Sequence, residues 1–126
     1  MKVVLQRVKE AYVEVNNDKI ASISKGLLVF WGIEKGDSFQ DAEVLIEKIL
    51  KLRIFSDDHR PINCSLKDVD GEILLVSQFT LYADLKGQNR PSFMQAALPD
   101  QAKTIYDHFV QRLKTQWQRV KTGEFG

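Results

Sequence analysis

The 126-residue sequence has few of the residues that build disulfides, metal sites or acid–base pairs. It contains one cysteine, Cys64, so no intrachain disulfide and no cysteine-based metal framework is expected. A single cysteine suits a reducing setting, and we expect a cytoplasmic location. The only two histidines, His59 and His108, match no metal-binding spacing and are expected on the solvated surface.

An excess of one charge and a long apolar run are also missing. Eighteen basic residues against 17 acidic ones give a net charge of +1, which argues against a protein that coats nucleic acid. Neither DNA nor a membrane is therefore expected as a partner, although a brief contact with an RNA end is compatible with this charge. The longest apolar run, Gly26–Ile33, is far shorter than the ~20 residues that a membrane-spanning helix needs. The charged, alternating N-terminus does not resemble a signal peptide.

The length predicts one domain over residues 1–126, with a core that needs no covalent staples. Alternation of apolar and polar residues predicts a strand over residues 2–8. Two further strand-like segments, Tyr12–Val15 and Lys19–Ser24, flank the turn residues Asn16-Asn17-Asp18 and predict a hairpin. The continuous apolar run Gly26–Glu34 indicates a central strand.

Two segments change to a helical period. Asp37, with Gln40 three residues later, predicts a helix N-terminus. The apolar positions at helical spacing in this first helix are Ala42, Leu45, Ile49 and Leu52, and Ile46 and Leu50 widen the apolar stripe. Pro99 suits the first turn of a second helix that ends near Trp117. Its apolar face consists of Ala102, Ile105, Phe109 and Leu113. The element order predicts an α/β fold with mixed, mostly antiparallel sheets and two main helices.

One segment raises a question about function. Ile73–Tyr82 is predicted to be a buried strand, yet Ser77, Gln78 and Thr80 lie in the middle of it. Burying a hydroxyl or amide without a partner costs about 1–3 kcal/mol. These residues either satisfy backbone groups at a strand end or a dimer contact, or they line a binding site.

Several motifs together carry a resemblance over the whole chain. They are "SQFTLYAD" (Ser77–Asp84), "GLLVFWGIEKGD" (Gly26–Asp37), "LRIFSD" (Leu52–Asp57), "RPSF" (Arg90–Phe93), "LQRV" (Leu5–Val8) and "TGEF" (Thr122–Phe125). In these motifs the sequence resembles the D-aminoacyl-tRNA deacylase family, also called D-tyrosyl-tRNA deacylases.

The resemblance implies a homodimeric hydrolase with a barrel-like body and a substrate pocket at the dimer interface. Its partner would be the aminoacylated 3′ end of tRNA. It would cleave the ester between a D-amino acid and the terminal adenosine, and also act on glycyl-tRNA, as chirality proofreading in translation. No metal and no organic cofactor are implied.

The same resemblance implies that Ser77, Gln78, Phe79 and Thr80 line the pocket for the aminoacylated adenosine. Backbone N–H groups near Phe79 would hold the ester carbonyl oxygen as charge develops on it. Thr80 invites a nucleophile role, but no histidine or carboxylate in the sequence is placed to activate its hydroxyl. An RNA-assisted mechanism, in which the adenosine 2′-hydroxyl participates, fits the missing base.

For each of the other candidate substrate-binding residues, a purely structural role is the alternative. Arg7 would brace the loop that checks chirality, or it is an exposed charge. Arg90, with Lys86, would meet tRNA phosphate, or both belong to a solvated loop. Phe93 would wall the pocket or belong to the core, and the core is favoured. A basic run would follow the tRNA acceptor stem or cover a solvated helix end; it consists of Arg112, Lys114, Arg119 and Lys121.

The sequence departs from the family after Gly126. The family continues with a segment that carries an Asn-x-Gly-Pro-type motif, whose main-chain carbonyls exclude L-amino acids. No proline here follows a glycine. We expect either that the sequence covers only part of a longer protein, or that the product itself is shorter. The alternative is a non-catalytic dimeric module that binds an RNA end or a protein. A small-molecule esterase is disfavoured because no activated serine or cysteine can be named.

Overall fold

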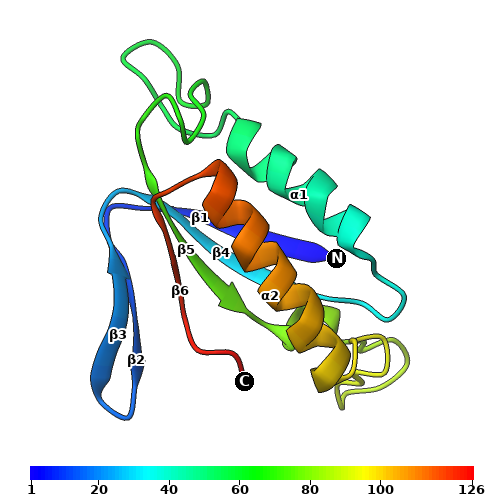
Figure 1. Ribbon diagram of the computed structural model, residues 1–126. Helices are drawn as coiled ribbons and strands as arrows, with labels where there is room; N and C mark the ends of the chain where they lie inside the picture. Colours follow the sequence, from blue (N-terminus) through cyan, green and yellow to red (C-terminus); the bar gives the residue numbers. More distant parts are fainter.

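The computed structural model describes residues 1–126; four strands come first along the chain, and the two α-helices then alternate with the last two strands (Figure 1). The elements are β1 (Lys2–Val8), β2 (Ala11–Val15), β3 (Asp18–Ile23), β4 (Gly26–Gly32), α1 (Phe39–Lys51), β5 (Glu72–Ser77), the 3₁₀ helix η1 (Phe79–Tyr82), α2 (Pro99–Gln116) and β6 (Val120–Thr122). Four strands form one sheet in the order β1-β4-β5-β6, and β2 and β3 form a separate hairpin. Neither helix is long and apolar enough to cross a membrane.

The predicted α/β class with two main helices is confirmed, but the strand directions differ from the prediction. β4 pairs with β5, and β5 with β6, in parallel, whereas β1–β4 and β2–β3 are antiparallel. Parallel and antiparallel strand pairs are therefore equal in number, and the sheets do not close into a barrel. The reason is that a helix lies between each parallel pair along the chain and carries it back across the sheet.

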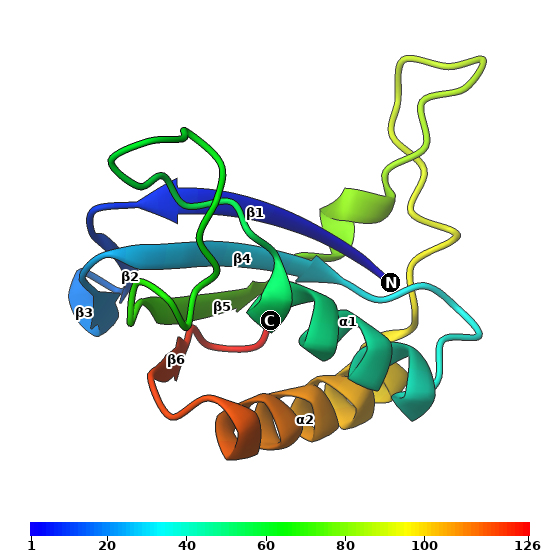
Figure 2. The ribbon, with the colours of Figure 1, turned by 90° about the horizontal axis from the view of Figure 1, so that it is seen from above.

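Both helices cover the same face of the four-stranded sheet (Figures 1 and 2). Alternate residues of the central strands, such as Val29 and Leu75, point toward the helices and are fully buried. Trp31 stacks on Phe109 of α2 with ring centroids 4.2 Å apart. This arrangement explains the continuous apolar run of β4, because the strand has neighbours on both sides and helices over one face.

Local sequence signals fixed most element boundaries. The hairpin turn is confirmed at Asn16 and Asn17, whose φ angles of 52° and 68° are those that asparagine tolerates in tight hairpin turns. Helix α1 starts one residue later than predicted. Ser38, not Asp37, caps it, and Ser38 and Asp41 form a reciprocal capping box. The carboxylate of Asp37 instead pairs with the Met1 ammonium group at 2.8 Å.

Candidate functional site

A cavity of about 660 Å³ opens where β4 and β5 end. In open sheets with parallel strands, ligands bind beyond the carboxyl ends of the strands, where the following loops and helix starts meet. The fifteen residues that line this cavity come from the ends of β4 and β5 and the residues just after them, the start of η1, the loop before α2 and its first turn, and the segment after β6. Ten of them are hydrophobic, so the cavity suits a ligand with a sizeable apolar part.

The chain turns sharply at the edge of this cavity. Gln78 donates its N–H to the carbonyl of Trp31 (2.8 Å), and hydrogen bonding then becomes local, with Leu81 N–H donating to Gln78 (3.3 Å). The ladder stops because β4 ends at Gly32. A Cβ at Gly32 would lie 3.0 Å from the Gln78 carbonyl oxygen, so glycine lets the turn pack closely. The strand predicted through Tyr82 is therefore wrong beyond the end of β5.

The structure brings three of the four motif residues to the cavity. Ser77, Gln78 and Phe79 line it, whereas Thr80 is exposed and is not among the lining residues. The Phe79 ring meets Phe93 edge-on, with centroids 5.1 Å apart. Phe93 is 37% exposed and lines the cavity, so the expectation that it belongs to the core was wrong. It lies outside the core because it follows a projecting loop.

Arg7 lies at the opposite end of the sheet from the cavity. In the strand register it is level with Ile73, near the start of β5, and not with Ser77 at its end. Its Nη1 donates to the carbonyls of Ile54 (3.0 Å) and Pro61 (3.4 Å). Within one chain Arg7 therefore braces the loop after α1 and does not join the cavity. A contact with a chirality-checking loop stays a prediction.

Arg90 and Lys86 lie on an exposed loop that projects from the rest of the molecule (Figure 2). The loop is closed at its base by paired backbone hydrogen bonds between Asp84 and Ser92, of 2.8 and 2.9 Å. Neither cationic side chain has an ion-pair partner. Both are therefore available to an external anion.

The C-terminal basic run is different, because most of it is engaged within the fold. Arg112 pairs with Glu43, Arg119 with Asp70, and the ammonium of Lys121 donates to the carbonyl of Ser22. These contacts tie α2 and β6 to their neighbours. They do not favour the hypothesis that the run follows an acceptor stem.

Sequence reasoning missed the lining residues from the loop before α2, from α2 itself and from the segment after β6, including Ala97, Ala102, Glu124 and Phe125. A helix that joins two parallel strands starts at the edge where the first strand ends, and the second strand ends at that same edge. The strand–helix–strand order of the chain was the signal that these strand ends and helix starts lie at one edge of the sheet. The expectation of mostly antiparallel pairing hid it.

The cavity offers apolar contacts, neutral hydrogen-bonding groups and one carboxylate, that of Glu124, rather than an acid–base pair. No histidine, cysteine or lysine lines it, and nowhere do three or more His, Cys, Asp or Glu residues gather as metal ligands would. Nearby, burial raises the pKa of Tyr82 to about 12, and the carboxylates of Asp37 and Glu34 add to the shift. The N–H groups of Phe79 and Thr80 precede the first hydrogen bond of η1, as the first donors of a helix do.

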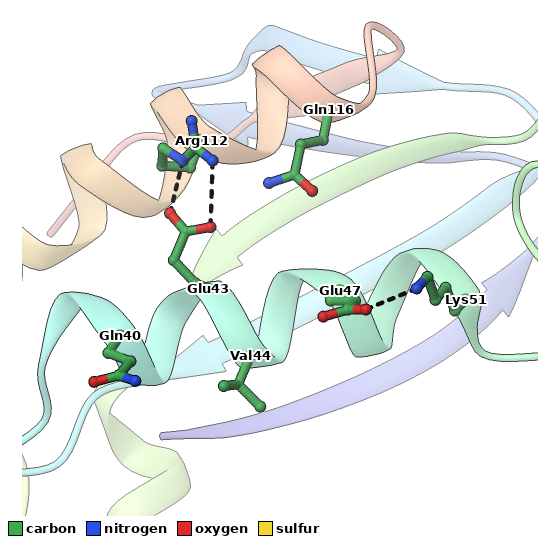
Figure 3. Close-up of a pocket in the computed structure, with 7 residues that line it drawn as sticks. All are labelled: Gln40, Glu43, Val44, Glu47, Lys51, Arg112 and Gln116. Carbon is green, nitrogen blue, oxygen red and sulfur yellow. Dashed lines mark hydrogen bonds and ion pairs between the residues drawn. The ribbon is translucent and has the colours of Figure 1, made fainter.

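A second, shallower cavity of about 440 Å³ lies between α1 and α2 (Figure 3). Glu43 Oε1 accepts a hydrogen bond from Arg112 Nε at 2.6 Å, and Lys51 Nζ lies 2.7 Å from Glu47 Oε1. The hydrogen bond from Arg112 lowers the pKa of Glu43, and Lys51 likewise lowers the pKa of Glu47. The charged residues that line this cavity pair with one another, and the Glu43–Arg112 pair links α1 to α2. None of the motif residues Ser77–Thr80 lines this cavity.

Comparisons with known proteins agree with one another. The family model described as D-Tyr-tRNA(Tyr) deacylase matches residues 4–126. A curated D-aminoacyl-tRNA deacylase of Thermosipho melanesiensis is 49% identical over 127 residues, covering 100% of this chain and 85% of the relative. A protein of the same name from Aquifex aeolicus is 49% identical over 126 residues, with the same coverage.

Two solved structures share the fold. One, titled "c-Myc DNA Unwinding Element Binding Protein", superposes with a TM-score of 0.93 at 40% identity, covering 100% of this chain and 86% of that one. The other, titled as a probable eukaryotic D-amino acid tRNA deacylase, has a TM-score of 0.82 at 21% identity and covers 98% and 88%. At that identity the second structure supports the fold alone.

The helix–helix ion pair predicts a pH-dependent effect on stability. Replacing Glu43 with glutamine (Glu43→Gln) should lower the urea midpoint of unfolding at neutral pH. Because the folded pKa of Glu43 is depressed, its contribution is present above the unfolded pKa and is lost as pH falls through the folded pKa. The two midpoints should therefore converge in acid. Glu47→Gln, which removes only a bridge within α1, is the matched control and should change the midpoint less. Equal midpoints for Glu43→Gln and wild type at neutral pH would contradict this account.

Proposed function

The chain belongs to the D-Tyr-tRNA(Tyr) deacylase family, and from this membership we infer that it hydrolyses the ester bond of D-aminoacyl-tRNA. It is a hydrolase that releases the free D-amino acid and the tRNA, as a proofreading step in translation. The observation that carries this conclusion is the match over residues 4–126, together with a cavity lined by Ser77, Gln78 and Phe79. A non-catalytic binding module is not favoured.

The reaction is the attack of water on the ester carbonyl, with the ribose 3′-oxygen as the leaving group. In our proposal the carbonyl oxygen lies against the backbone N–H of Phe79, which stabilises the negative charge of the tetrahedral intermediate. One such donor contributes about 10²–10³ in rate in other enzymes. The side chains of Ser77 and Gln78 orient the substrate within the cavity. The apolar lining holds the amino-acid side chain or the adenine.

The proton transfers are assigned to water and to the vicinal 2′-hydroxyl of the terminal adenosine. This assignment is supported by the lining of the cavity, which holds no histidine. Thr80 contributes through its backbone, because its exposed hydroxyl has no activating partner. No metal ion and no organic cofactor are part of the proposal.

A proline substitution tests the backbone donor. Phe79 is the first residue of η1, where proline fits, and Gln78 before it is extended (φ −150°, ψ 94°), as proline requires. Phe79→Pro deletes the N–H and the ring, whereas the control Phe79→Ala deletes the ring alone. With D-tyrosyl-tRNA as substrate, kcat of the proline variant should fall about 10²–10³ below that of the alanine variant.

Two further measurements, on a Thr80 variant and with a metal chelator, complete this test. Thr80→Val should keep kcat within a few-fold of wild type, whereas a covalent nucleophile role predicts a loss of at least about a thousandfold. Hydrolysis should continue in the presence of a metal chelator. A wild-type enzyme that binds D-tyrosyl-tRNA without cleaving it would overturn the proposed function and favour the binding module.

We also propose that the active form is a homodimer, built on the sheet face away from the helices. That face carries Val4, Leu28, Phe30 and Val76, which alternate with the helix-facing residues in the strand register. No helix covers it, Val4 is 50% exposed, and the other three are partly exposed. A second copy would bury this apolar surface.

A charged residue on this face should break the dimer. Val4→Lys is expected to shift the sedimentation-equilibrium mass from dimer to monomer and to lower activity with it. Val44→Lys, at a 65% exposed position on the outer side of α1, is the matched control and should leave the mass unchanged. An unchanged dimer in Val4→Lys, or a wild type that sediments as a monomer, would contradict the proposal.

The tRNA partner is proposed to contact the projecting loop through Lys86 and Arg90, whose side chains are unpaired. This role places the protein in the cytoplasm, where aminoacyl-tRNA is used. One solved relative bears a DNA-binding title, but the net charge of +1 does not favour DNA as a partner here.

Salt dependence tests the loop contact. The double variant Lys86→Gln/Arg90→Gln should raise KM for D-tyrosyl-tRNA and reduce the slope of log KM against log salt by about 1–2. KM for the short substrate D-tyrosyl-adenosine should stay unchanged, because it cannot reach the loop. Lys114→Gln, an exposed cation on α2, is the control. An equal effect on both substrates would assign the two residues to folding instead.

A further inference from the structure

Exposed apolar side chains are concentrated on one short stretch of the chain. Eleven large hydrophobic side chains are exposed in the molecule, and five of them lie between residues 79 and 98. We call these five the rim: Phe79, Leu85, Phe93, Met94 and Leu98. Phe79, Phe93 and Leu98 also line the cavity at the ends of β4 and β5, so they stand at its mouth. Single exposed apolar residues are ordinary, whereas a group of them beside a cavity marks a binding surface.

The backbone holds the rim in place on two sides. The paired hydrogen bonds at the base of the projecting loop close one side (Figure 2). On the other side, Lys35 donates its N–H to the carbonyl of Gln95 (3.0 Å), and Ala97 donates to the carbonyl of Ile33 (2.9 Å). These bonds fix the segment after Met94 against the chain that leaves β4. A surface fixed in this way loses little conformational freedom when a ligand binds to it.

The charge of this stretch favours an anionic partner. Residues 85–98 contain two cations, Lys86 and Arg90, and no aspartate or glutamate. A second copy of the chain on the rim would bring like charges together, which disfavours that occupant. Cations beside exposed aromatic and apolar side chains are the combination that binds single-stranded nucleic acid, because the phosphates meet the cations and the bases stack on the rings.

The mouth of the cavity is also where a polynucleotide has to leave it. In the proposed function the cavity holds the aminoacylated terminal adenosine, and the nucleotides before it are unpaired in tRNA. We propose that the rim binds these preceding nucleotides, with their bases against the apolar side chains and their phosphates toward Lys86 and Arg90. The inference rests on the proposed function. It makes the rim a selector for an unpaired 3′ end, and a tolerant one, because every base has a face that can stack.

A binding experiment separates base stacking from phosphate contacts and from turnover. Three probes carry the same stable amide, 3′-(D-tyrosylamino)-3′-deoxyadenosine. One is this nucleoside alone, one has it at the end of the trinucleotide CCA, and one is the same trinucleotide with both cytosine bases removed. They are titrated by calorimetry into the full chain. Wild type should bind the CCA probe at least about fivefold more tightly than the abasic probe, although the two have equal numbers of phosphates.

Variants of the rim should lose this preference for bases. In Leu85→Ser/Met94→Ser, the ratio of the two trinucleotide affinities should fall at least about threefold. The nucleoside probe should bind as in wild type, since neither residue lines the cavity. Phe93→Ala, at a residue that also lines the cavity, should lower the same ratio. Ile62→Ser, at an exposed apolar residue of the loop after α1, is the matched control and should bind all three probes as wild type does.

Four results would overturn the inference. Wild type could bind the CCA and abasic probes equally, or the double variant could keep the full ratio. The double variant could also lose affinity for the nucleoside probe to the same extent, which would assign the two residues to folding. If it sedimented as a monomer where wild type is a dimer, the rim would be an interface between copies.

A parallel assay with D-tyrosyl-tRNA keeps the two proposals apart. Cleavage by a wild type that does not distinguish the CCA probe from the abasic probe would reject the stacking role and leave the proposed function standing. Base-dependent binding without cleavage would count against the proposed hydrolysis alone.

Discussion

The parallel pairing of β4 with β5 is the contact on which the rest of the molecule depends. It brings the ends of the two strands to one edge, with Trp31 opposite Ser77. It also requires the chain to return across one face through α1, so the helices and the core form on that side. The glycine that follows Trp31 lets the Gln78 turn pack closely, and the cavity opens beyond it.

The chemistry of the site follows from what this edge presents. A strand end and a 3₁₀ turn supply backbone donors, two phenylalanine rings supply a wall, and the segment after β6 supplies one carboxylate. No histidine, cysteine or lysine lines the cavity, so the single carboxylate has no partner for acid–base catalysis. Such a site favours a substrate that brings its own reactive groups, and an ester beside a ribose hydroxyl is one.

Features that depend on a few neighbouring residues could be predicted. The Asn16-Asn17 turn, the Pro99 helix start and the apolar stripes of both helices were all placed correctly. The motif Ser77–Thr80 marked the site region, yet its backbone was predicted as a strand. Its turn forms because the partner strand β4 ends, which is a fact about another part of the chain.

By itself the sequence determined most of the elements and the family, since periodicity, caps and motifs depend on nearby residues. Tertiary structure alone decided that Glu124 and Ser77 line one cavity, that Phe93 forms a wall and not core, and that Arg7 lies at the far end of the sheet. Residues so far apart along the chain meet only when both parallel strand pairs, β4–β5 and β5–β6, have formed. Whether these strand pairs form depends on the packing of both helices against one face of the sheet, and no short stretch of sequence specifies that packing.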